Sequence, residues 1–409
     1  MYHNLLPPDA MEKLHLSLSW DCNENCRFCL KKAPAQQVNR PLPLRDCLAM
    51  LKRARAAGCR WVSLDGGEPA LRSDLPQIIK SALLLGYRKI DVMTNGTRFA
   101  DPALVRLLAS LSPVIRRRLF FCVSLHARKA AVSDALTRRP GGHALTVAGI
   151  RNLLAAGFTV SVSHVITKPA CKDLPAFAEF VLKDLKGVSE VVFSHIYPVI
   201  HSLPAVRRLY PRFSDARPFL DAAVARLGKG KVAVDLGNSE MLPVCLTGGR
   251  EAFFAEAFLH NSVAAVTYDR NKLDTGDSRK LESMPLASDQ FGERNKVKGP
   301  ACRRCLLAPV CGGVWKFYAE LYGFRELRPY GREFFSRLKV RGAAAAVGVS
   351  GDMPPAAAAR RAMAQALAAR LKGRRVRFVF PRSFDKKAAA GLLSFAAEIG
   401  AVKAQGKGQ

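Results

Sequence analysis

The sequence predicts an α/β protein built on a parallel sheet, and two observations carry this prediction. Apolar or alternating segments of strand length recur through the first half of the chain, and segments with helical periodicity separate them. Glycines, polar residues or histidines close many of the strand-like segments. Strands that alternate with helices form a parallel sheet with right-handed crossovers, and such sheets bind ligands at the carboxyl ends of their strands. We therefore expect one shared site at those ends.

Each element follows from its local pattern. The first strand is expected at residues 14–20, where Leu14, Leu16 and Leu18 alternate with polar residues. Five more strands are expected at residues 61–64, 90–94, 119–125, 159–166 and 190–196. Helices with apolar residues three or four positions apart are expected at residues 44–58, 75–85, 102–109, 145–156 and 174–185. These elements predict a first domain of residues 10–200.

The alternation breaks after residue 199, which predicts a second domain of residues 201–335. One helix is expected there at 218–227, a short strand at 232–236 and a long polar segment at 269–298. A third, basic α/β module is expected at residues 336–409. Its expected elements are strands at 344–349 and 376–380 and helices at 355–371 and 388–399.

The composition bounds the class of protein. The chain has 409 residues, of which 49% are hydrophobic, so it is long enough for two or three folded domains. No apolar run approaches the roughly 18 residues of a membrane span, and the first residues lack the plan of a signal peptide. We therefore expect a cytoplasmic protein that makes no membrane contact and keeps its 11 cysteines reduced. Clustered cysteines then indicate metal ligands.

The net charge of +31 indicates attraction to a polyanion. From residue 337 onward the chain has fifteen Lys or Arg residues against three Asp or Glu. A basic cluster in this region comprises Arg370, Lys372, Arg374, Arg375 and Arg377. A solvated basic surface without a partner is the favoured interpretation of such a cluster, and binding of an acidic peptide or RNA is the functional alternative.

Three cysteines, Cys22, Cys26 and Cys29, lie within eight residues after the first predicted strand. Thiolates are soft ligands that suit iron and zinc. Three thiolates leave one iron of a four-iron cluster without a protein ligand, and a catalytic metal needs such an open position. The spacing Cys-x3-Cys-x2-Cys, with Phe28 before the last cysteine, resembles the radical S-adenosylmethionine (radical SAM) superfamily. A zinc loop or a chance cluster is the alternative.

The resemblance implies a partial TIM barrel, (β/α)6, that binds a [4Fe–4S] cluster and S-adenosylmethionine. Gly66-Gly67-Glu68-Pro69 follows the second predicted strand, and glycines let a backbone approach a ligand closely, although such a segment can also be an ordinary turn. The resemblance implies that this segment holds the methionine amino group of the cofactor. The full set of cofactor contacts that it implies is Phe28, Gly66, Gly67, Glu68, Asn95, Ser124 and Arg139.

Three histidines, His126, His164 and His195, occupy the ends of predicted strands. They are candidates for substrate contacts or proton transfer. The alternative interpretation is that they are polar residues whose hydrogen bonds are satisfied within the fold.

A second cysteine group comprises Cys245, Cys302, Cys305 and Cys311. Four thiolates close a tetrahedral site with no open position, so the spacing alone allows zinc or a second [4Fe–4S] cluster. The continuation Cys311-Gly-Gly-Val-Trp resembles the auxiliary domains called SPASM and twitch. A full SPASM domain needs further cysteines, and Cys311 is the last in the chain, so the resemblance implies one auxiliary cluster, as in twitch domains. Electron transfer or structural support would be its role.

The resemblance implies reductive cleavage of S-adenosylmethionine to a 5′-deoxyadenosyl radical that abstracts a substrate hydrogen, with flavodoxin or ferredoxin as electron donor. We expect an oxidoreductase-type enzyme that modifies a peptide or protein. The alternative reactions are oxidation or rearrangement of a small molecule and RNA modification. An alternative from a different class is a non-catalytic binding protein with a structural metal site.

Overall fold

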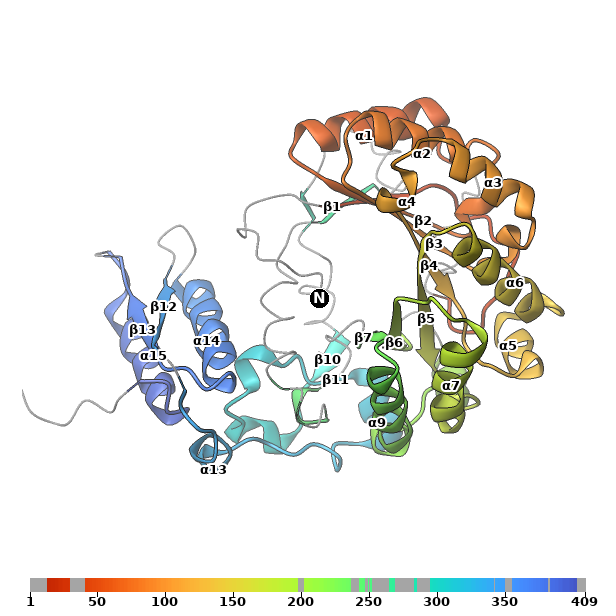
Figure 1. Ribbon diagram of the computed structural model, residues 1–409. Coiled ribbons are helices and arrows are strands. Elements are labelled where there is room, and N and C mark those ends of the chain that lie inside the picture. The colour runs from red at the N-terminus through yellow and green to blue at the C-terminus, as the bar shows by residue number, and fades with distance from the viewer. Residues whose placement is uncertain are drawn as a thin grey trace, which may run out of the picture. The chain divides into compact units, whose positions relative to one another are not determined.

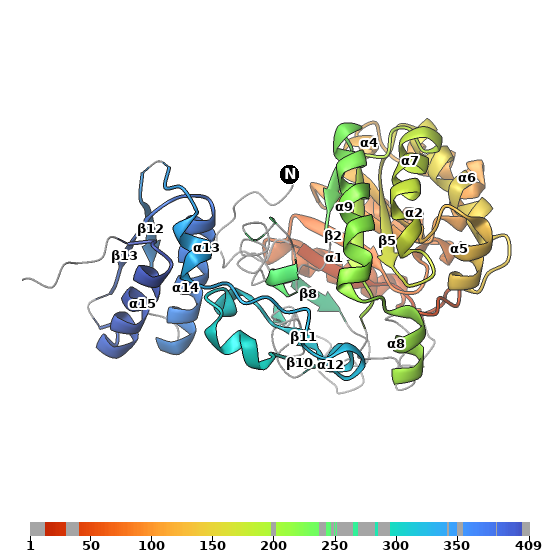
Figure 2. The ribbon, with the colours of Figure 1, turned by 90° about the horizontal axis from the view of Figure 1, so that it is seen from below.

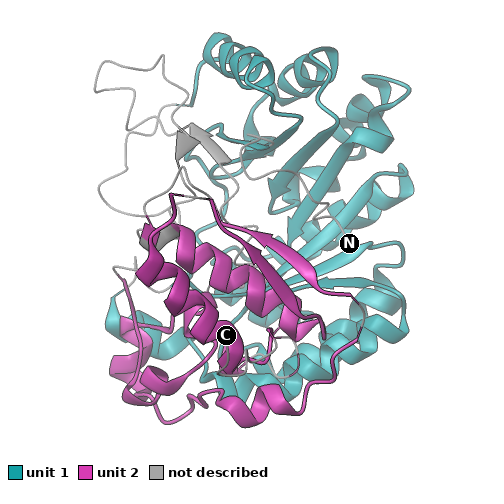
Figure 3. Ribbon diagram, turned by 90° about the vertical axis from the view of Figure 1, so that its left-hand side faces the viewer, with its two compact units in different colours: residues 1–238, 263–286 teal, residues 239–262, 287–409 magenta. Residues whose placement is uncertain are grey.

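The computed structural model divides the chain into two compact units, which Figure 3 colours separately: residues 1–238 with 263–286, and residues 239–262 with 287–409. The structure describes residues 13–29, 41–197, 202–236, 243–246, 249, 251, 265–268, 283–284, 295–341, 343–349, 355–381 and 383–402. No helix in these ranges is both long and apolar enough to cross a bilayer.

Unit 1 is built on one sheet, and the predicted parallel α/β fold is confirmed there (Figure 1). The strand order is β7-β6-β5-β4-β3-β2-β1-β8-β9, and every neighbouring pair is parallel except β8 with β9. The strands are β1 (Lys13–Ser17), β2 (Trp61–Asp65), β3 (Lys89–Thr94), β4 (Leu119–Ser124), β5 (Thr159–Ile166), β6 (Glu190–His195), β7 (Ala233–Asp235), β8 (Ala265–Tyr268) and β9 (Ser283–Met284).

Helices lie on the outer side of this sheet, as Figures 1 and 2 show. They are α1 (Leu44–Ala56), α2 (Leu75–Leu84), α3 (Pro102–Ser110), α4 (Ile115–Arg118), α5 (Ala130–Thr137), α6 (Gly142–Ala155), α7 (Leu174–Asp184) and α9 (Phe213–Lys229). Helix α8 (Leu203–Leu209) lies beyond the end of β5, where Leu209 O accepts from Lys168 N. The apolar core lies between helices and sheet, where strand residues such as Leu16, Leu64 and Val92 are fully buried. This face holds the strands in register and leaves the loops at their carboxyl ends to form a site.

The inner face of the sheet is polar. Trp61 of β2 donates its indole N–H to Asp91 of β3 at 2.6 Å, and the Lys89 ammonium lies 3.5 Å from the same carboxylate. The ammonium groups of Lys13 and Lys89 lie 3.9 and 4.0 Å from the centre of the Trp61 ring. Typical β/α barrels fill this space with branched apolar side chains. A polar inner face is better suited to polar ligands.

Several elements were not predicted. Helices α4, α5 and α8 and strands β8 and β9 are additional, and α6 begins at Gly142 instead of residue 145. Helix α9 begins at Phe213 and continues through Pro218, because Phe213 and Leu220 lie on its buried face. Strand β8 pairs in parallel with β1, and this contact joins segments some 250 residues apart that local patterns cannot connect.

Unit 2 begins with short elements and ends in an α/β module. The short elements are η7 (Val244–Leu246), β10 (Lys296–Val297), η9 (Pro300–Arg304), η10 (Ala308–Val310), β11 (Val314–Trp315), α12 (Lys316–Tyr322) and α13 (Arg332–Ser336). The module comprises β12 (Ala345–Gly348), α14 (Pro355–Leu371), β13 (Val376–Val379) and α15 (Lys386–Glu398). Its two strands are parallel, α14 contacts both, and α15 packs against α14.

One residue of the predicted basic cluster is not at the surface. Arg370 of α14 is only 3% exposed and donates to the carbonyl oxygens of Phe335, Leu338 and Ile399 at 2.7, 2.9 and 2.9 Å. These bonds tie α14 to α13, to Leu338 just after it and to the end of α15. Arg370 therefore stabilises the module and cannot contribute to a surface that binds a polyanion.

Candidate cluster and cofactor site

The loop that leaves β1 carries Cys22, Cys26 and Cys29, whose thiols lie close enough to affect one another electrostatically. Burial raises the pKa of Cys22 to about 11, and the pKa of Cys26 is raised further, by burial and by nearby Glu24 and Cys29. Neighbouring buried thiolates therefore need a compensating positive charge, which a bound metal supplies. The residues present thus fit a metal centre.

Gly66 and Gly67 pack directly against this loop. The N–H of Gly67 donates to Ser19 O at 2.6 Å, and the N–H of Glu68 donates to Asp21 O at 2.7 Å. A Cβ at position 66 would lie 2.2 Å from the Ser19 carbonyl oxygen, and one at position 67 would lie 2.1 Å from that of Asp21. The close approach of the cysteine loop therefore requires glycine at both positions. From the sequence alone, we expected a ligand to be the reason for these glycines.

Glu68 links the second strand to the third. One carboxylate oxygen accepts from Ala70 N at 2.9 Å and from the Thr94 hydroxyl at 2.6 Å, and the other accepts from Asn95 N at 2.6 Å. The side chain is 1% exposed, and burial raises its pKa while these three hydrogen bonds oppose the shift. Within the described residues, both carboxylate oxygens thus already have protein donors, and Glu68 positions Asn95.

Asn95 reaches the cysteine loop from the end of β3. Its Nδ2 donates to Asn23 Oδ1 at 2.6 Å and lies 3.9 Å from Cys22 Sγ. Asn23 in turn donates to the Thr97 hydroxyl at 2.9 Å, and Arg139 donates from Nη1 to Asn23 O at 2.7 Å. The structure therefore brings Asn95 and Arg139 to the middle of the cysteine motif.

The other side of the loop lies against residues that follow β4. Backbone N–H groups of Asn25 and Arg27 donate to Thr137 O and Leu136 O, each at 2.9 Å. The Phe28 ring, which is 7% exposed, meets the His126 ring edge-on at 4.7 Å between centroids. Phe28 and His126 therefore lie in the same site.

Glu24, Asn23 and Thr97 were not singled out from the sequence. Glu24 is buried inside the loop, and its carboxylate accepts from the Cys26 thiol at 3.4 Å. Burial raises the pKa of Glu24 to about 7. Their one sequence signal is position, since Asn23 and Glu24 lie between two of the cysteines and Thr97 lies two residues after Asn95.

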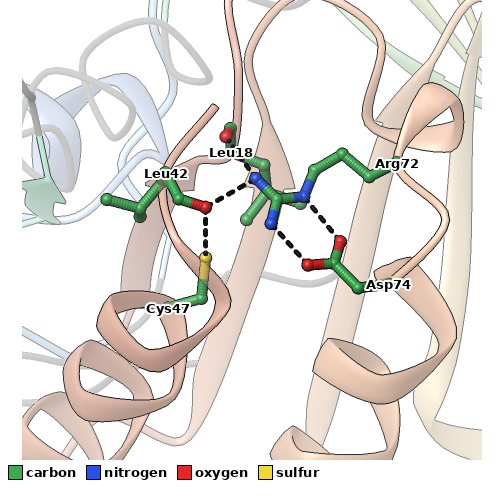
Figure 4. A network of polar contacts seen from close by, with 5 residues as sticks. All are labelled: Leu18, Leu42, Cys47, Arg72 and Asp74. Carbon is green, nitrogen blue, oxygen red and sulfur yellow. Dashed lines mark hydrogen bonds and ion pairs between the residues drawn. The ribbon is translucent and has the colours of Figure 1, made fainter. Parts of the chain in front are cut away.

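Arg72 closes the base of the cysteine loop, as Figure 4 shows. Its Nη1 donates to Leu18 O at 2.9 Å and to Leu42 O at 2.7 Å, on either side of the cysteines in the sequence. Its Nε and Nη2 donate to the two carboxylate oxygens of Asp74 at 2.8 and 2.7 Å. The Cys47 thiol also donates to Leu42 O, at 3.7 Å. A bidentate ion pair thus holds the guanidinium where it joins both ends of the loop.

The other two predicted histidines face helices α7 and α9, and the His164 ring also lies 6.3 Å from that of His126. His164 shares the outer face of β5 with Val162, and its ring lies 4.4 Å from that of Phe177 in α7. His195 lies on the same face of β6, against Phe213 of α9 at 5.1 Å. Burial lowers the pKa of His164 to about 3 and that of His195 to about 4.

Ser124, the remaining predicted cofactor contact, ends β4. It lies beside Ser163 of β5 on the inner face of the sheet and is half-buried. This places it at the carboxyl end of a strand, on the polar side of the sheet.

The second cysteine group converges within unit 2. Cys245 lies in η7, and burial raises its pKa to about 12, with further increases from the thiols of Cys311, Cys305 and Cys302. Backbone N–H groups of Tyr330 and Gly313 donate to the sulfurs of Cys305 and Cys311, each at 3.4 Å. The Tyr330 hydroxyl donates to the carboxylate of Glu251, which is 8% exposed. These N–H groups point at two of the four sulfurs that would hold a metal.

Comparison with known proteins identifies the family. Residues 17–170 match the family model described as "Radical SAM superfamily". The predicted radical SAM domain is confirmed over these residues.

Curated relatives carry the name probable GTP 3′,8-cyclase. One from Saccharolobus islandicus (strain M.14.25 / Kamchatka #1) is 31% identical over 196 residues, which cover 46% of this chain and 58% of that protein. One from Metallosphaera sedula is 29% identical over 190 residues, which cover 46% and 57%. The chain thus spans little more than half the length of these relatives.

Among solved structures, the chain is similar in fold to Streptococcus suis SuiB bound to precursor peptide SuiA. The TM-score is 0.50 at 14% sequence identity, and the match covers 76% of this chain and 73% of that one.

Proposed function

We propose that this protein uses S-adenosylmethionine and a [4Fe–4S] cluster to abstract a hydrogen atom from its substrate. Cys22, Cys26 and Cys29 would hold the cluster, which would supply the one electron that cleaves S-adenosylmethionine to methionine and a 5′-deoxyadenosyl radical. The observation that carries the proposal is the docking of the cysteine loop on Gly67 and Asn95. These residues end separate strands, and the fold brings them to one edge.

The chain's own residues would position the cysteine loop, shield it from water and bind the cofactor. Gly66 and Gly67 bring the end of β2 against the cysteine loop, so their backbone groups lie next to Ser19 and Asp21, just before Cys22. The buried rings of Phe28 and His126 pack together next to Cys29 and would shield that side of a bound cluster from water. Ser124 and Arg139 offer a hydroxyl and a guanidinium for the polar groups of the cofactor.

We propose that the second cysteine group, Cys245, Cys302, Cys305 and Cys311, holds another [4Fe–4S] cluster in a twitch-like domain. The thiols of Cys302, Cys305 and Cys311 lie near that of Cys245, and such a set of four suits either zinc or a four-iron cluster. The resemblance of Cys311-Gly-Gly-Val-Trp to twitch domains favours the cluster, with flavodoxin or ferredoxin as a suitable electron donor.

A peptide or protein side chain is the substrate class that we propose. The fold likeness to peptide-bound SuiB extends over 76% of the chain, so it includes more than the barrel. A nucleotide is the second candidate, because relatives matching 46% of the chain are named GTP 3′,8-cyclase.

The test is formation of 5′-deoxyadenosine by the anaerobically reconstituted protein with dithionite and S-adenosylmethionine, measured by mass spectrometry. We expect product from the wild type and from Cys59→Ala, a buried cysteine outside both groups, and none from a variant with alanine at positions 22, 26 and 29. Absence of product from a wild type with full iron content would favour a non-catalytic protein. Stimulation by GTP, but not by a peptide encoded beside the gene, would favour the nucleotide.

A further inference from the structure

The sheet of the C-terminal module has an edge that is unpaired within the described residues. Ala345 N donates to Arg375 O at 2.8 Å, and Val349 N donates to Val379 O at 3.0 Å, so these N–H groups point toward β13. Peptide groups alternate in direction along a strand, so Ala346 and Gly348 direct their backbone groups to the opposite edge. The sheet has two strands, β12 and β13, and the opposite edge of β12 has no strand beside it in this part of the structure.

This edge lacks the features that usually protect exposed strands. Proteins block such edges with charged side chains, proline or a bulge. Strand β12 is Ala-Ala-Val-Gly, without a charge or a proline. Ala346 and Gly348 are exposed, and a methyl group and a hydrogen atom leave the backbone accessible. Another extended chain can therefore pair with β12.

Basic residues gather at the amino end of this edge. Arg341 N donates to Gly373 O at 2.5 Å, which joins the segment before β12 to the turn after α14. Lys339, Arg341 and Arg374 are exposed beside this contact, and Arg377 is exposed on β13. None of these four takes part in an ion pair found among the described residues, where Arg332 pairs with Glu398. The edge therefore begins in a region of positive potential.

We propose that the C-terminal module binds an acidic, extended polypeptide segment, which adds as a strand to the free edge of β12. Backbone hydrogen bonds would supply affinity, and carboxylates near Arg341 and Arg374 would set position and specificity. The inference goes beyond the radical chemistry, since this binding requires neither a cluster nor S-adenosylmethionine.

The same surface is less suited to nucleic acid. Single-stranded nucleic acids bind basic grooves that also present aromatic rings for base stacking. The aromatic rings near β13 contact each other: Phe378 lies 5.9 Å from Phe380, which lies 5.6 Å from Phe384. All three rings belong to residues that are half-buried. An unpaired backbone edge, in contrast, is a feature that only a polypeptide can use.

The test is fluorescence anisotropy of the full-length protein with labelled twelve-residue probes at physiological salt. The probes are alternating Glu-Thr, alternating Lys-Thr and oligouridine. We expect the Glu-Thr peptide to bind more tightly than either of the others. The variant Arg341→Gln/Arg374→Gln/Arg377→Gln should lose affinity about tenfold. The matched control Lys52→Gln/Lys80→Gln/Arg106→Gln, on exposed residues of unit 1, should change it less than about twofold.

A second pair of variants tests strand addition separately from charge. Ala346→Pro removes an N–H that β13 does not use, so we expect weaker peptide binding with unchanged circular dichroism, whereas Ala346→Ser should bind as the wild type does. Equal binding by Ala346→Pro and Ala346→Ser would overturn the strand-addition proposal. Tighter binding of oligouridine than of the Glu-Thr peptide, or no binding of that peptide, would overturn the choice of partner. Neither result bears on 5′-deoxyadenosine formation.

Discussion

Gly67 lies so close to Asp21 that a Cβ at position 67 would come within 2.1 Å of the Asp21 carbonyl oxygen. The loops that follow β1 and β2 are therefore in direct backbone contact, with no side chain between them. Contacts of this kind fix the cysteine loop before any ligand binds, and they explain why a glycine pair follows β2.

Gly67→Ala should displace the cysteine loop, because carbonyl oxygen and backbone cannot yield as a flexible side chain can. We expect the reconstituted variant to lose most of the iron bound at Cys22, Cys26 and Cys29, measured against protein concentration. Gly228→Ala is the matched control, since a Cβ there meets nothing within 4 Å. Full iron content in Gly67→Ala would show that the close contact does not matter.

Arg72→Lys should weaken the base of the same loop. Lysine keeps the charge but has a single nitrogen. It cannot donate to both carboxylate oxygens of Asp74 and to the carbonyl oxygens of Leu18 and Leu42 at the same time. We expect a loss of about 2 kcal/mol in the free energy of unfolding, measured with urea on the protein without metal. Arg98→Lys, at an exposed position, should change it little. If Arg72→Lys were as stable as the wild type, Arg72 would not stabilise the base of the cysteine loop.

Acid should destabilise unit 1 through its buried histidines. The pKa of His195 falls from 6.5 to about 4 on burial. The unfolded chain therefore binds more protons than the folded one between these values, and stability is complete above pH 6.5 and falls as the pH drops toward 4. His195→Phe keeps a ring against Phe213 and removes the titration. We expect the urea midpoint of this variant to fall less than that of the wild type between pH 7 and pH 5, and equal falls would contradict the assignment.

Alanine at positions 22, 26 and 29 should isolate the second metal centre. We expect about four irons per chain to remain after reconstitution, because the four cysteines of unit 2 are untouched. Elemental analysis checks this, and a further Cys302→Ala/Cys305→Ala exchange should remove the remaining iron. Zinc in place of iron would assign Cys245, Cys302, Cys305 and Cys311 to a structural site.

Much of the barrel was predictable, because each strand and helix has its own local pattern. The expected strands at 61–64, 90–94 and 159–166 correspond closely to β2, β3 and β5. Contacts distant in sequence could not be predicted in this way. The pairing of β1 with β8 and the bonds from Arg72 to Leu18 and Leu42 arise only when the chain folds.

The alternation of residues along a strand predicts which face a histidine occupies, but only within the strand. Val160, Val162 and His164 alternate in phase along β5, so the sequence already places His164 on the face of the two valines. That face packs against α7, as the ring contact with Phe177 shows. His126 lies beyond the end of β4, where alternation gives no guidance, and only the structure reveals its contact with Phe28.

We propose that the Cys22 loop holds a cluster with one iron open to S-adenosylmethionine. The most direct measurement is the electron paramagnetic resonance spectrum of the dithionite-reduced Cys302→Ala/Cys305→Ala variant, with and without S-adenosylmethionine. An open iron predicts a reduced-cluster signal whose g-values shift when the cofactor is added. A cluster signal that stays unchanged at saturating S-adenosylmethionine would contradict the account.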